Sequence, residues 1–327
     1  DVESGEAREL RLPAGFSSFA SFALGGTKLL VQSSSATRRS ELLLYDLATD
    51  ECETVLPADY GSIDPALFVQ DEHVWYPSSD GRMVPAILYR PRDLKPGEKR
   101  PAILDVHGGP TGQWWRTFND VAQLMADRGY VVLLPNPRGS TGYGTEWRDA
   151  ALKDWGGVDL EDVAAGVEYL RGLGIVDPER IGITGGSYGG YMTYIATTKK
   201  PDLFKAAVPI VGITDLPALY EAMMEHFKYY LREQLGDPVE NADLYRDRSA
   251  STHAANLRAK MLILHGKNDP RCPLDQAEIF KQRLVENGKV EGRDFEYHLF
   301  DDGHGMADVK GKTMTRNLIL EYFERHL

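Results

Sequence analysis

From about residue 103 to the end, short apolar runs alternate with segments of helical periodicity, and this alternation constrains the fold more than any other feature. The runs are rich in Val, Ile and Leu, which is typical of strands buried on both faces of a parallel sheet. A repeated strand–helix rhythm predicts an α/β fold, in which helices cover both faces of a mostly parallel, doubly wound sheet. The expected strands are 102–106, 130–134, 180–184, 206–211, 261–265 and 295–300, and the expected helices are 117–128, 158–172, 187–199, 274–287 and 311–325.

The first 70 residues follow a different pattern. Short strands are expected at 29–32, 41–46 and 53–56, separated by turns rich in Ser, Gly and Thr and without a helical period. We therefore divide the chain into a small all-β module, residues 1–70, and an α/β domain, residues 71–327. The module resembles one blade of a β-propeller, whereas a propeller needs about 4–8 blades. Because a lone blade exposes the edges of its strands, we expect a homodimer that pairs through this module.

The α/β rhythm is interrupted at about residues 214–258. Within this insertion, residues 216–235 are expected to be helical and carry several Met and aromatic side chains. Such a segment is often only part of the hydrophobic core. At this position it can also form a pocket wall above the sheet, where adaptable Met and rigid aromatic side chains suit an acyl group or a side chain. Met223 and Phe227 are therefore candidate substrate-binding residues.

Composition and charge restrict the class of protein. The chain has 327 residues, 42% of them hydrophobic, and a net charge of −12, which argues against binding to nucleic acid. No run of 18 apolar residues occurs, so no membrane span is expected. Cys52 and Cys272 are too few for a disulfide framework, and we expect a cytoplasmic protein. Because the chain begins at Asp1, we also expect it to be a processed product or a piece of a longer chain.

Residues 185–189 read Gly-Gly-Ser-Tyr-Gly, a G-x-S-x-G pattern with Ser187 at its centre. An expected strand precedes the pattern and an expected helix follows it, which is the context of a nucleophile elbow. The glycines leave room for a tight turn on which a serine is strained and exposed. A non-catalytic glycine-rich turn is the alternative, because the bare pattern is a weak signal. We interpret Ser187 as a nucleophile, since other parts of the same machinery follow it along the chain.

A serine hydroxyl needs a base to take its proton and an acid to orient that base. In α/β-hydrolases the acid and the histidine follow the nucleophile in the order Ser, Asp or Glu, His. Asp269 follows the expected strand 261–265, and His304 follows the expected strand 295–300. Both therefore lie at the carboxyl edge of the sheet, where open α/β folds bind ligands. We predict that Asp269 and His304 complete a triad with Ser187.

Each of these assignments has an alternative. Asp269 precedes a proline and can be read as a turn residue, and Asp215, after the previous expected strand, competes with it for the role of the acid. His304 can be read as a solvated loop histidine. His265 lies inside an apolar strand, so we interpret it as a buried core histidine.

Acyl transfer also needs hydrogen-bond donors for the oxyanion of the tetrahedral intermediate, each worth about 3–4 kcal/mol when deleted. One expected donor is the backbone N–H of Tyr188, at the start of the helix. The other is expected from the loop that reads His107-Gly-Gly-Pro, with Gly109 preferred to Gly108; a plain glycine turn is the alternative. His107 and Tyr143 are further candidates for substrate binding.

No cofactor or metal ion is expected. Residues 139–144, Gly-Ser-Thr-Gly-Tyr-Gly, follow a strand but lack the spacing of a dinucleotide fingerprint and its downstream acid. An H-E-x-x-H motif, a Cys/His cluster and an EF-hand loop are all missing from the sequence.

Six motifs occur in order within residues 72–327. They are His107-Gly-Gly-Pro110, Asn136-Pro-Arg-Gly-Ser-Thr-Gly-Tyr-Gly144, Asp154-Trp-Gly-Gly157 with Asp159 and Asp162, Gly185-Gly-Ser-Tyr-Gly-Gly190, His265-Gly-Lys-Asn-Asp-Pro-Arg271 and Asp302-Gly-His-Gly305. Together they resemble the catalytic domain of the prolyl oligopeptidase family, in particular its acylaminoacyl-peptidase branch. The resemblance implies an α/β-hydrolase fold, the triad Ser187, Asp269 and His304, and oxyanion donors at Gly109 and Tyr188.

The resemblance also implies short peptides, acyl-peptides or small esters as substrates. Members of the family usually carry a complete N-terminal propeller that screens the active site, whereas residues 1–70 have room for one blade. We therefore expect a serine hydrolase that cleaves acyl-peptide, peptide or ester bonds through an acyl-enzyme. The alternatives are a carboxylesterase with little or no peptidase activity and, more remotely, a non-catalytic binding or assembly module.

Overall fold

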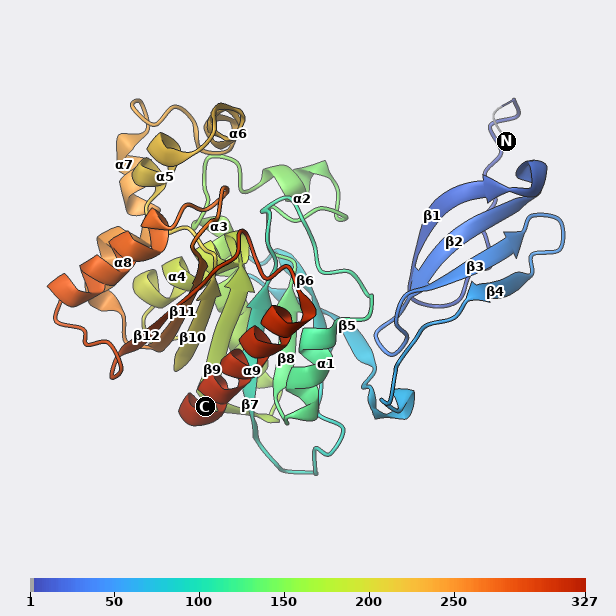
Figure 1. Ribbon diagram of the computed structural model, residues 1–327, viewed down its shortest axis with the longest axis horizontal. Helices are drawn as coiled ribbons and strands as arrows, with labels where there is room; N and C mark the ends of the chain where they lie inside the picture. Colours follow the sequence, from blue (N-terminus) through green and yellow to red (C-terminus); the bar gives the residue numbers. More distant parts are fainter. Residues whose placement is uncertain (1–2) are drawn as a thin grey trace.

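The computed structural model describes residues 3–327 and is built around an eight-stranded sheet in the order β12-β11-β10-β9-β7-β8-β6-β5 (Figure 1). Its strands are β5 (Asp71–Pro77), β6 (Met83–Tyr89), β7 (Arg100–Val106), β8 (Val131–Pro135), β9 (Val176–Gly186), β10 (Ala206–Ile210), β11 (Lys260–Gly266) and β12 (Phe295–Phe300). Strands β7 to β12 are parallel to one another, whereas β6 pairs antiparallel with β5 and β8. The predicted α/β fold is confirmed.

Helices cover both faces of this sheet (Figure 1). On one face lie α1 (Asp120–Asp127) and α9 (Val309–His326), and on the other lie α3 (Val158–Gly172), α4 (Tyr188–Lys199) and α8 (Asp275–Glu286). All five residues of β8 are buried as a result, which explains why the central strands are continuous apolar runs. Short helix α2 (Thr145–Asp149) follows β8. In the part of the chain that the structure describes, no helix is both long and apolar enough to cross a membrane.

The insertion after β10 is helical over most of residues 216–235, as expected, but it is divided into two helices. It forms α5 (Leu216–Ala222) and α6 (Glu225–Leu235), followed by α7 (Ala242–Asp247) and the 3-10 helix η3 (Ala250–Asn256). Met223 and Met224, which lie within the expected helical segment, adopt extended backbone angles between α5 and α6, with ψ of 158° and 149°. Asp215 caps the first of them, accepting a hydrogen bond from the Ala218 amide.

The N-terminal residues form a separate antiparallel sheet in the order β1-β2-β3-β4. Its strands are β1 (Phe16–Ala23), β2 (Lys28–Ser34), β3 (Glu41–Asp46) and β4 (Cys52–Leu56), with the 3-10 turns η1 (Leu24–Gly26) and η2 (Pro65–Leu67) nearby. The sequence did not predict β1. Leu29, Val31, Leu43 and Tyr45 form a small core of their own, and β4, an edge strand, is exposed along its whole length.

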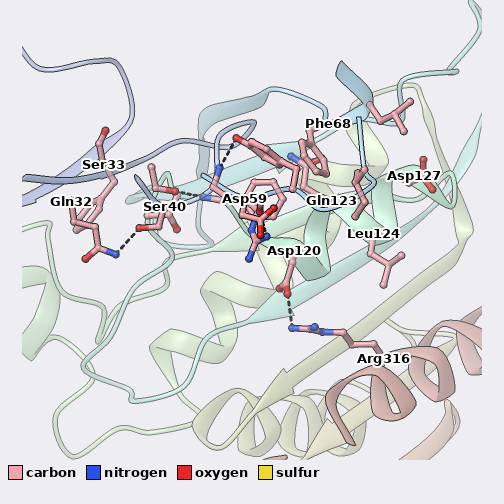
Figure 2. Close-up of a pocket in the computed structure, with 18 residues that line it drawn as sticks. Gln32, Ser33, Ser40, Asp59, Phe68, Asp120, Gln123, Leu124, Asp127 and Arg316 are labelled. Atoms are coloured by element: carbon pink, nitrogen blue, oxygen red, sulfur yellow. Dashed lines mark hydrogen bonds and ion pairs between the residues drawn. The ribbon is translucent and has the colours of Figure 1, made fainter. Parts of the chain in front are cut away.

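The β-sheet module contacts the α/β domain through the side chain of Gln123 on α1. Its amide nitrogen donates to the carbonyl oxygens of Ala36 and Val69, both at 2.8 Å, and its oxygen accepts from the Val69 amide at 2.9 Å. Beside this junction lies a cavity of about 980 Å³, drawn in Figure 2, which is bordered by the ion pair between Asp120 and Arg316. The predicted site residues do not line this cavity.

Candidate active site

Ser187 lies at a sharp turn between β9 and α4, with φ 59° and ψ −117°. Such backbone angles are strained for a residue with a side chain and are found at functional turns. The neighbouring glycines allow the turn, because a Cβ atom at Gly185 or Gly189 would lie 2.5 or 1.9 Å from the carbonyl oxygen of Val106. The local sequence therefore forces β7, β9 and α4 into close contact at the nucleophile elbow.

The amide of Tyr188 is the first of α4 and has no acceptor within that helix. It therefore remains available for a negative charge that forms beside Ser187. The side chain of Tyr188 is buried, and its hydroxyl donates a hydrogen bond to the carboxyl group of Asp159 in the first turn of α3. Its ring packs edge-on against Trp155 at 4.9 Å between centroids.

Asp159 is fully buried, and burial raises its pKa to about 7, although hydrogen bonds from the Tyr188 hydroxyl and the Leu160 amide act in the opposite direction. A buried titratable group one side chain away from a predicted oxyanion donor is a feature of functional sites. Sequence reasoning assigned Asp159 only to the charge pattern at the start of a helix and to a family motif, because its partner is 29 residues away.

Asp269 and His304 lie next to each other at the carboxyl edge of the sheet, after β11 and β12. The distance from Asp269 Oδ2 to His304 Nδ1 is 2.7 Å. The other oxygen, Oδ1, accepts hydrogen bonds from the amides of Arg271 at 2.8 Å and Cys272 at 2.9 Å. Burial by itself would raise the pKa of Asp269, but these hydrogen bonds and the one to His304 hold it below its ordinary value. Asp269 therefore stays ionised and orients the imidazole ring.

His265 holds the loop that carries Asp269 through a hydrogen bond. Its Nε2 lies 2.8 Å from the carbonyl oxygen of Cys272, and the side chain is fully buried. Burial lowers the pKa of His265, so the ring is neutral and its one proton sits on Nε2. The buried thiol of Cys272 in turn lies against the Ser187 hydroxyl, which links the acid loop to the nucleophile.

Asp215, the competitor for the role of the acid, has other partners. Besides capping α5 with Oδ1, it accepts a hydrogen bond from the Ser251 hydroxyl on Oδ2 at 2.8 Å. Both of its carboxylate oxygens are therefore used within the insertion, whereas Asp269 is paired with a histidine.

The loop after β7 approaches the nucleophile closely. A Cβ atom at Gly108 would lie 3.5 Å from the Cβ atom of Ser187, so this backbone borders the space where a substrate carbonyl would sit. Gly109 has φ +136°, a conformation that favours glycine. The Tyr230 hydroxyl of α6 forms a hydrogen bond with Thr111, so the insertion contacts this loop.

The candidate substrate-binding residues have different environments. His107 is buried, with Gly108 and Ser140 as hydrogen-bond partners. The Tyr143 hydroxyl accepts a hydrogen bond from Asn136 at 2.9 Å. Met223 is buried at the end of α5, and Phe227 is half-buried on α6. Their roles in binding a substrate stay predictions.

The site combines a strained serine, a carboxylate–histidine pair after later strands and the backbone amide at the start of α4. These features define the class of α/β-hydrolases with a serine nucleophile. A family model described as "Prolyl oligopeptidase family" matches residues 116–327. The chain belongs to the prolyl oligopeptidase family, and the match places it among the serine peptidases.

Proteins similar in sequence support this family assignment. The chain is 34% identical over 298 residues to "Uncharacterized peptidase YuxL" of Bacillus subtilis, which covers 89% of this chain and 44% of that protein. It is also 34% identical over 242 residues to "Dipeptidyl aminopeptidase BIII" of Pseudoxanthomonas mexicana, covering 70% of this chain and 34% of that protein. The chain thus spans less than half the length of these two relatives.

Solved structures show the same relationship. A Mycobacterium tuberculosis puromycin-hydrolyzing peptidase superposes with a TM-score of 0.90 at 28% identity, over 100% of this chain and 50% of that one. Pyrococcus horikoshii acylaminoacyl peptidase superposes with a TM-score of 0.86 at 34% identity, over 99% of this chain and 51% of that one. The likeness covers the N-terminal β-sheet module as well as the α/β domain.

Proposed function

We propose that this chain carries the catalytic site of a serine hydrolase that cleaves amide bonds of acyl-peptides or short peptides, and activated esters, through an acyl-enzyme. The observation that carries the proposal is the 2.7 Å contact between Asp269 and His304, at the same sheet edge as the strained Ser187. In this proposal Ser187 is the nucleophile, His304 is the general base and Asp269 orients it.

The reaction has two half-steps. Ser187 Oγ attacks the carbonyl carbon while His304 Nε2 takes the hydroxyl proton, and the oxyanion accepts hydrogen bonds from the amides of Tyr188 and Gly109. The tetrahedral intermediate then expels the amine or alcohol, which receives that proton from His304. A water molecule, deprotonated by the same histidine, releases the acyl group and restores Ser187.

In this proposal the helical insertion next to the nucleophile binds an apolar acyl group or side chain. Tyr188, Trp155 and Tyr230 form an aromatic cluster, with Trp155 centroids 4.9 Å from Tyr188 and 6.4 Å from Tyr230. Aromatic walls with a few polar groups are typical of small-molecule sites. Tyr188 and Trp155 are buried in the core, whereas Tyr230 is half-buried. Tyr230, Met223 and Phe227, all from the insertion, therefore form the proposed pocket wall.

The names of the relatives favour a peptidase over a pure esterase. They include a dipeptidyl aminopeptidase, an acylaminoacyl peptidase and a puromycin-hydrolyzing peptidase. A carboxylesterase is the second candidate, because ester cleavage has the better leaving group and tolerates a less well placed base.

The test compares kcat/KM for N-acetyl-alanine p-nitroanilide and for the matching p-nitrophenyl ester, with Ser187→Ala as the blank. Turnover of both substrates supports the peptidase, and turnover of the ester alone supports the carboxylesterase. We expect Ser187→Ala to lower kcat by about 10⁴-fold or more without loss of the fold. Equal turnover by wild type and Ser187→Ala would contradict both candidates.

A further inference from the structure

The cavity of about 980 Å³ beside the junction of the β-sheet module and the α/β domain has no role in the proposed reaction (Figure 2). Its volume is at the upper end of the range of about 300–1,000 Å³ that is usual for ligand pockets. Most of its wall comes from β1, β2 and the turn after β2, from the connection between β4 and β5, and from α1 with the segment before it. A molecule bound here would therefore not occupy the space beside Ser187.

One part of the cavity wall is aromatic. The ring of Phe68 lies edge-on to the ring of Phe118, with 4.8 Å between centroids, and the Tyr60 ring lies 5.9 Å from Phe68. Partly exposed apolar side chains around a concave surface are typical of binding sites. This part of the wall therefore suits a ligand with an aromatic ring or another apolar group. Further apolar surface comes from Phe16, Ile63, Leu67 and Leu124.

Arg39 brings an unpaired positive charge to the cavity. Its Nη1 donates a hydrogen bond to the carbonyl oxygen of Asp59, and its amide donates to the Tyr60 hydroxyl at 3.2 Å. Among the described residues 3–327, no carboxylate forms an ion pair with this guanidinium. Because a guanidinium has five N–H donors, several remain for a ligand, and the matching partner of such a fork is a carboxylate.

The Ser40 hydroxyl, next to Arg39 in the chain, adds a second donor. Its oxygen accepts a hydrogen bond from Gln32 Nε2 at 2.6 Å. In the part of the chain that the structure describes, the hydroxyl proton itself has no acceptor. It can therefore donate to a ligand atom. The wall formed by Arg39 and Ser40 thus offers donors to a group that has only acceptors, as an ionised carboxylate has.

The acidic side chains of the cavity do not cancel this preference. Asp120 is paired with Arg316 at 2.6 Å, so their charges balance. Asp59 Oδ1 accepts a hydrogen bond from a backbone amide of the following turn at 2.8 Å. Asp127 lies on the far side of the cavity from Gln32 (Figure 2). The charge that remains available on the wall beside the aromatic rings is that of Arg39.

We propose that this cavity binds an apolar carboxylate, with the carboxylate on Arg39 and Ser40 and the apolar group against Phe68 and Phe118. The class includes N-acyl amino acids and the carboxyl ends of short peptides, which the proposed hydrolysis would release. The site itself does not depend on that function, because the predicted triad and oxyanion donors do not line the cavity.

Three related probes test the chemistry of the site. N-acetyl-phenylalanine carries the carboxylate, N-acetyl-phenylalaninamide is its neutral analogue, and phenylalaninamide is a cation. Their binding is measured by isothermal titration calorimetry in Ser187→Ala, in which the amide probes are not hydrolysed. We expect the carboxylate probe to bind about tenfold more tightly than either amide, since hydrogen bonds to a charged group are stronger than neutral ones.

Substitutions at the two ends of the site locate the bound probe. Arg39 is exposed, so Arg39→Gln is expected to fold. It should weaken binding of N-acetyl-phenylalanine about tenfold and leave that of N-acetyl-phenylalaninamide within twofold. Phe68→Leu should weaken binding of both. Arg11→Gln removes another exposed arginine of the β-sheet module, outside the cavity, and should leave both affinities within twofold.

The outcomes separate this inference from the proposed function. The cavity site is overturned if no probe binds, if an amide probe binds as tightly as the carboxylate, or if Arg39→Gln keeps the affinity of Ser187→Ala for N-acetyl-phenylalanine. Should Phe68→Leu not fold, Arg39→Gln with its Arg11→Gln control decides. A wild type that hydrolyses no test substrate overturns the proposed function alone, because the heat of binding is measured without turnover.

Discussion

The Tyr188 hydroxyl donates a hydrogen bond to the buried carboxyl group of Asp159, so the residue that follows the nucleophile is anchored through its side chain as well as its backbone. Asp159 belongs to α3, on the face of the sheet opposite α1 and α9. The first turn of one helix thus supports the first turn of another, at the position where the proposed oxyanion donor must stay still.

Asp159 makes stability depend on pH. Burial raises its folded-state pKa to about 7, above the value of about 3.9 in an unfolded chain, so the native protein binds this proton more tightly. Its contribution to the free energy of unfolding is full below pH 4 and is lost as the pH rises through 7, a change of about 4 kcal/mol. In Asp159→Asn the free energy of unfolding should not fall in this way, because the amide does not titrate.

Chemical denaturation of wild type and Asp159→Asn between pH 4.5 and 8 measures the effect. The stability of the variant relative to wild type should increase as the pH rises to about 7 and level off above it. Asp105, whose pKa burial also raises to about 7, is present in both proteins and cancels in the difference. A difference that is flat with pH would show that Asp159 does not titrate there.

Substituting Asp269 and Asp215 separately tests which of the two is the acid of the triad. In Asp269→Asn the side-chain amide can no longer accept the Nδ1 proton of His304 as a carboxylate does, so the ring loses its orientation. We expect kcat to fall by about 10⁴-fold with a small change in KM. Asp215→Asn keeps an oxygen to cap α5, and its kcat should stay within fivefold of wild type. The reverse result in steady-state kinetics would move the acid to Asp215.

The buried ion pair between Arg138 and Asp162 is expected to dominate the stability of the loop before α2. The side chain of Asp162 is fully buried and that of Arg138 nearly so. Removing one partner leaves a buried charge, so Asp162→Ala should lower the free energy of unfolding by about 3–5 kcal/mol. The exposed pair of Lys267 and Asp301 is the control, and Asp301→Ala should change stability by less than about 1 kcal/mol. Similar effects in urea denaturation would contradict this difference.

Two glycines of the nucleophile elbow test the packing of β7 against α4. A Cβ atom at Gly189 would lie 1.9 Å from the Val106 carbonyl oxygen, whereas at Gly186 its nearest neighbour is the Ile210 carbonyl oxygen at 4.0 Å. Gly189→Ala is therefore expected to destabilise the fold by about 3 kcal/mol or more, and Gly186→Ala by less than about 1 kcal/mol. Thermal denaturation of the two variants side by side measures this. If Gly189→Ala were as stable as Gly186→Ala, β7 and α4 could move apart without a cost in free energy.

Much of the α/β domain was predictable because its signals are local. Buried strands such as β8 are unbroken apolar runs, and α3 begins and ends at the predicted residues 158 and 172. Strands β5 and β6 were not predicted, since they stand before the strand–helix rhythm and one of them contains Pro85. The break between α5 and α6 was also missed, because Met223 and Met224 are compatible with a helix and only the surrounding packing extends them.

The sequence by itself determined the strand–helix order, the glycine-lined turn at Ser187 and the order of serine, acid and histidine along the chain. These features depend on neighbouring residues and on a periodicity that short segments carry. Only the tertiary structure decided that Asp159 supports Tyr188, that Asp215 is a helix cap and that His107 joins Gly108 to Ser140. Contacts of this kind connect distant segments, and burial, which no local pattern encodes, sets the protonation state of Asp159 and His107.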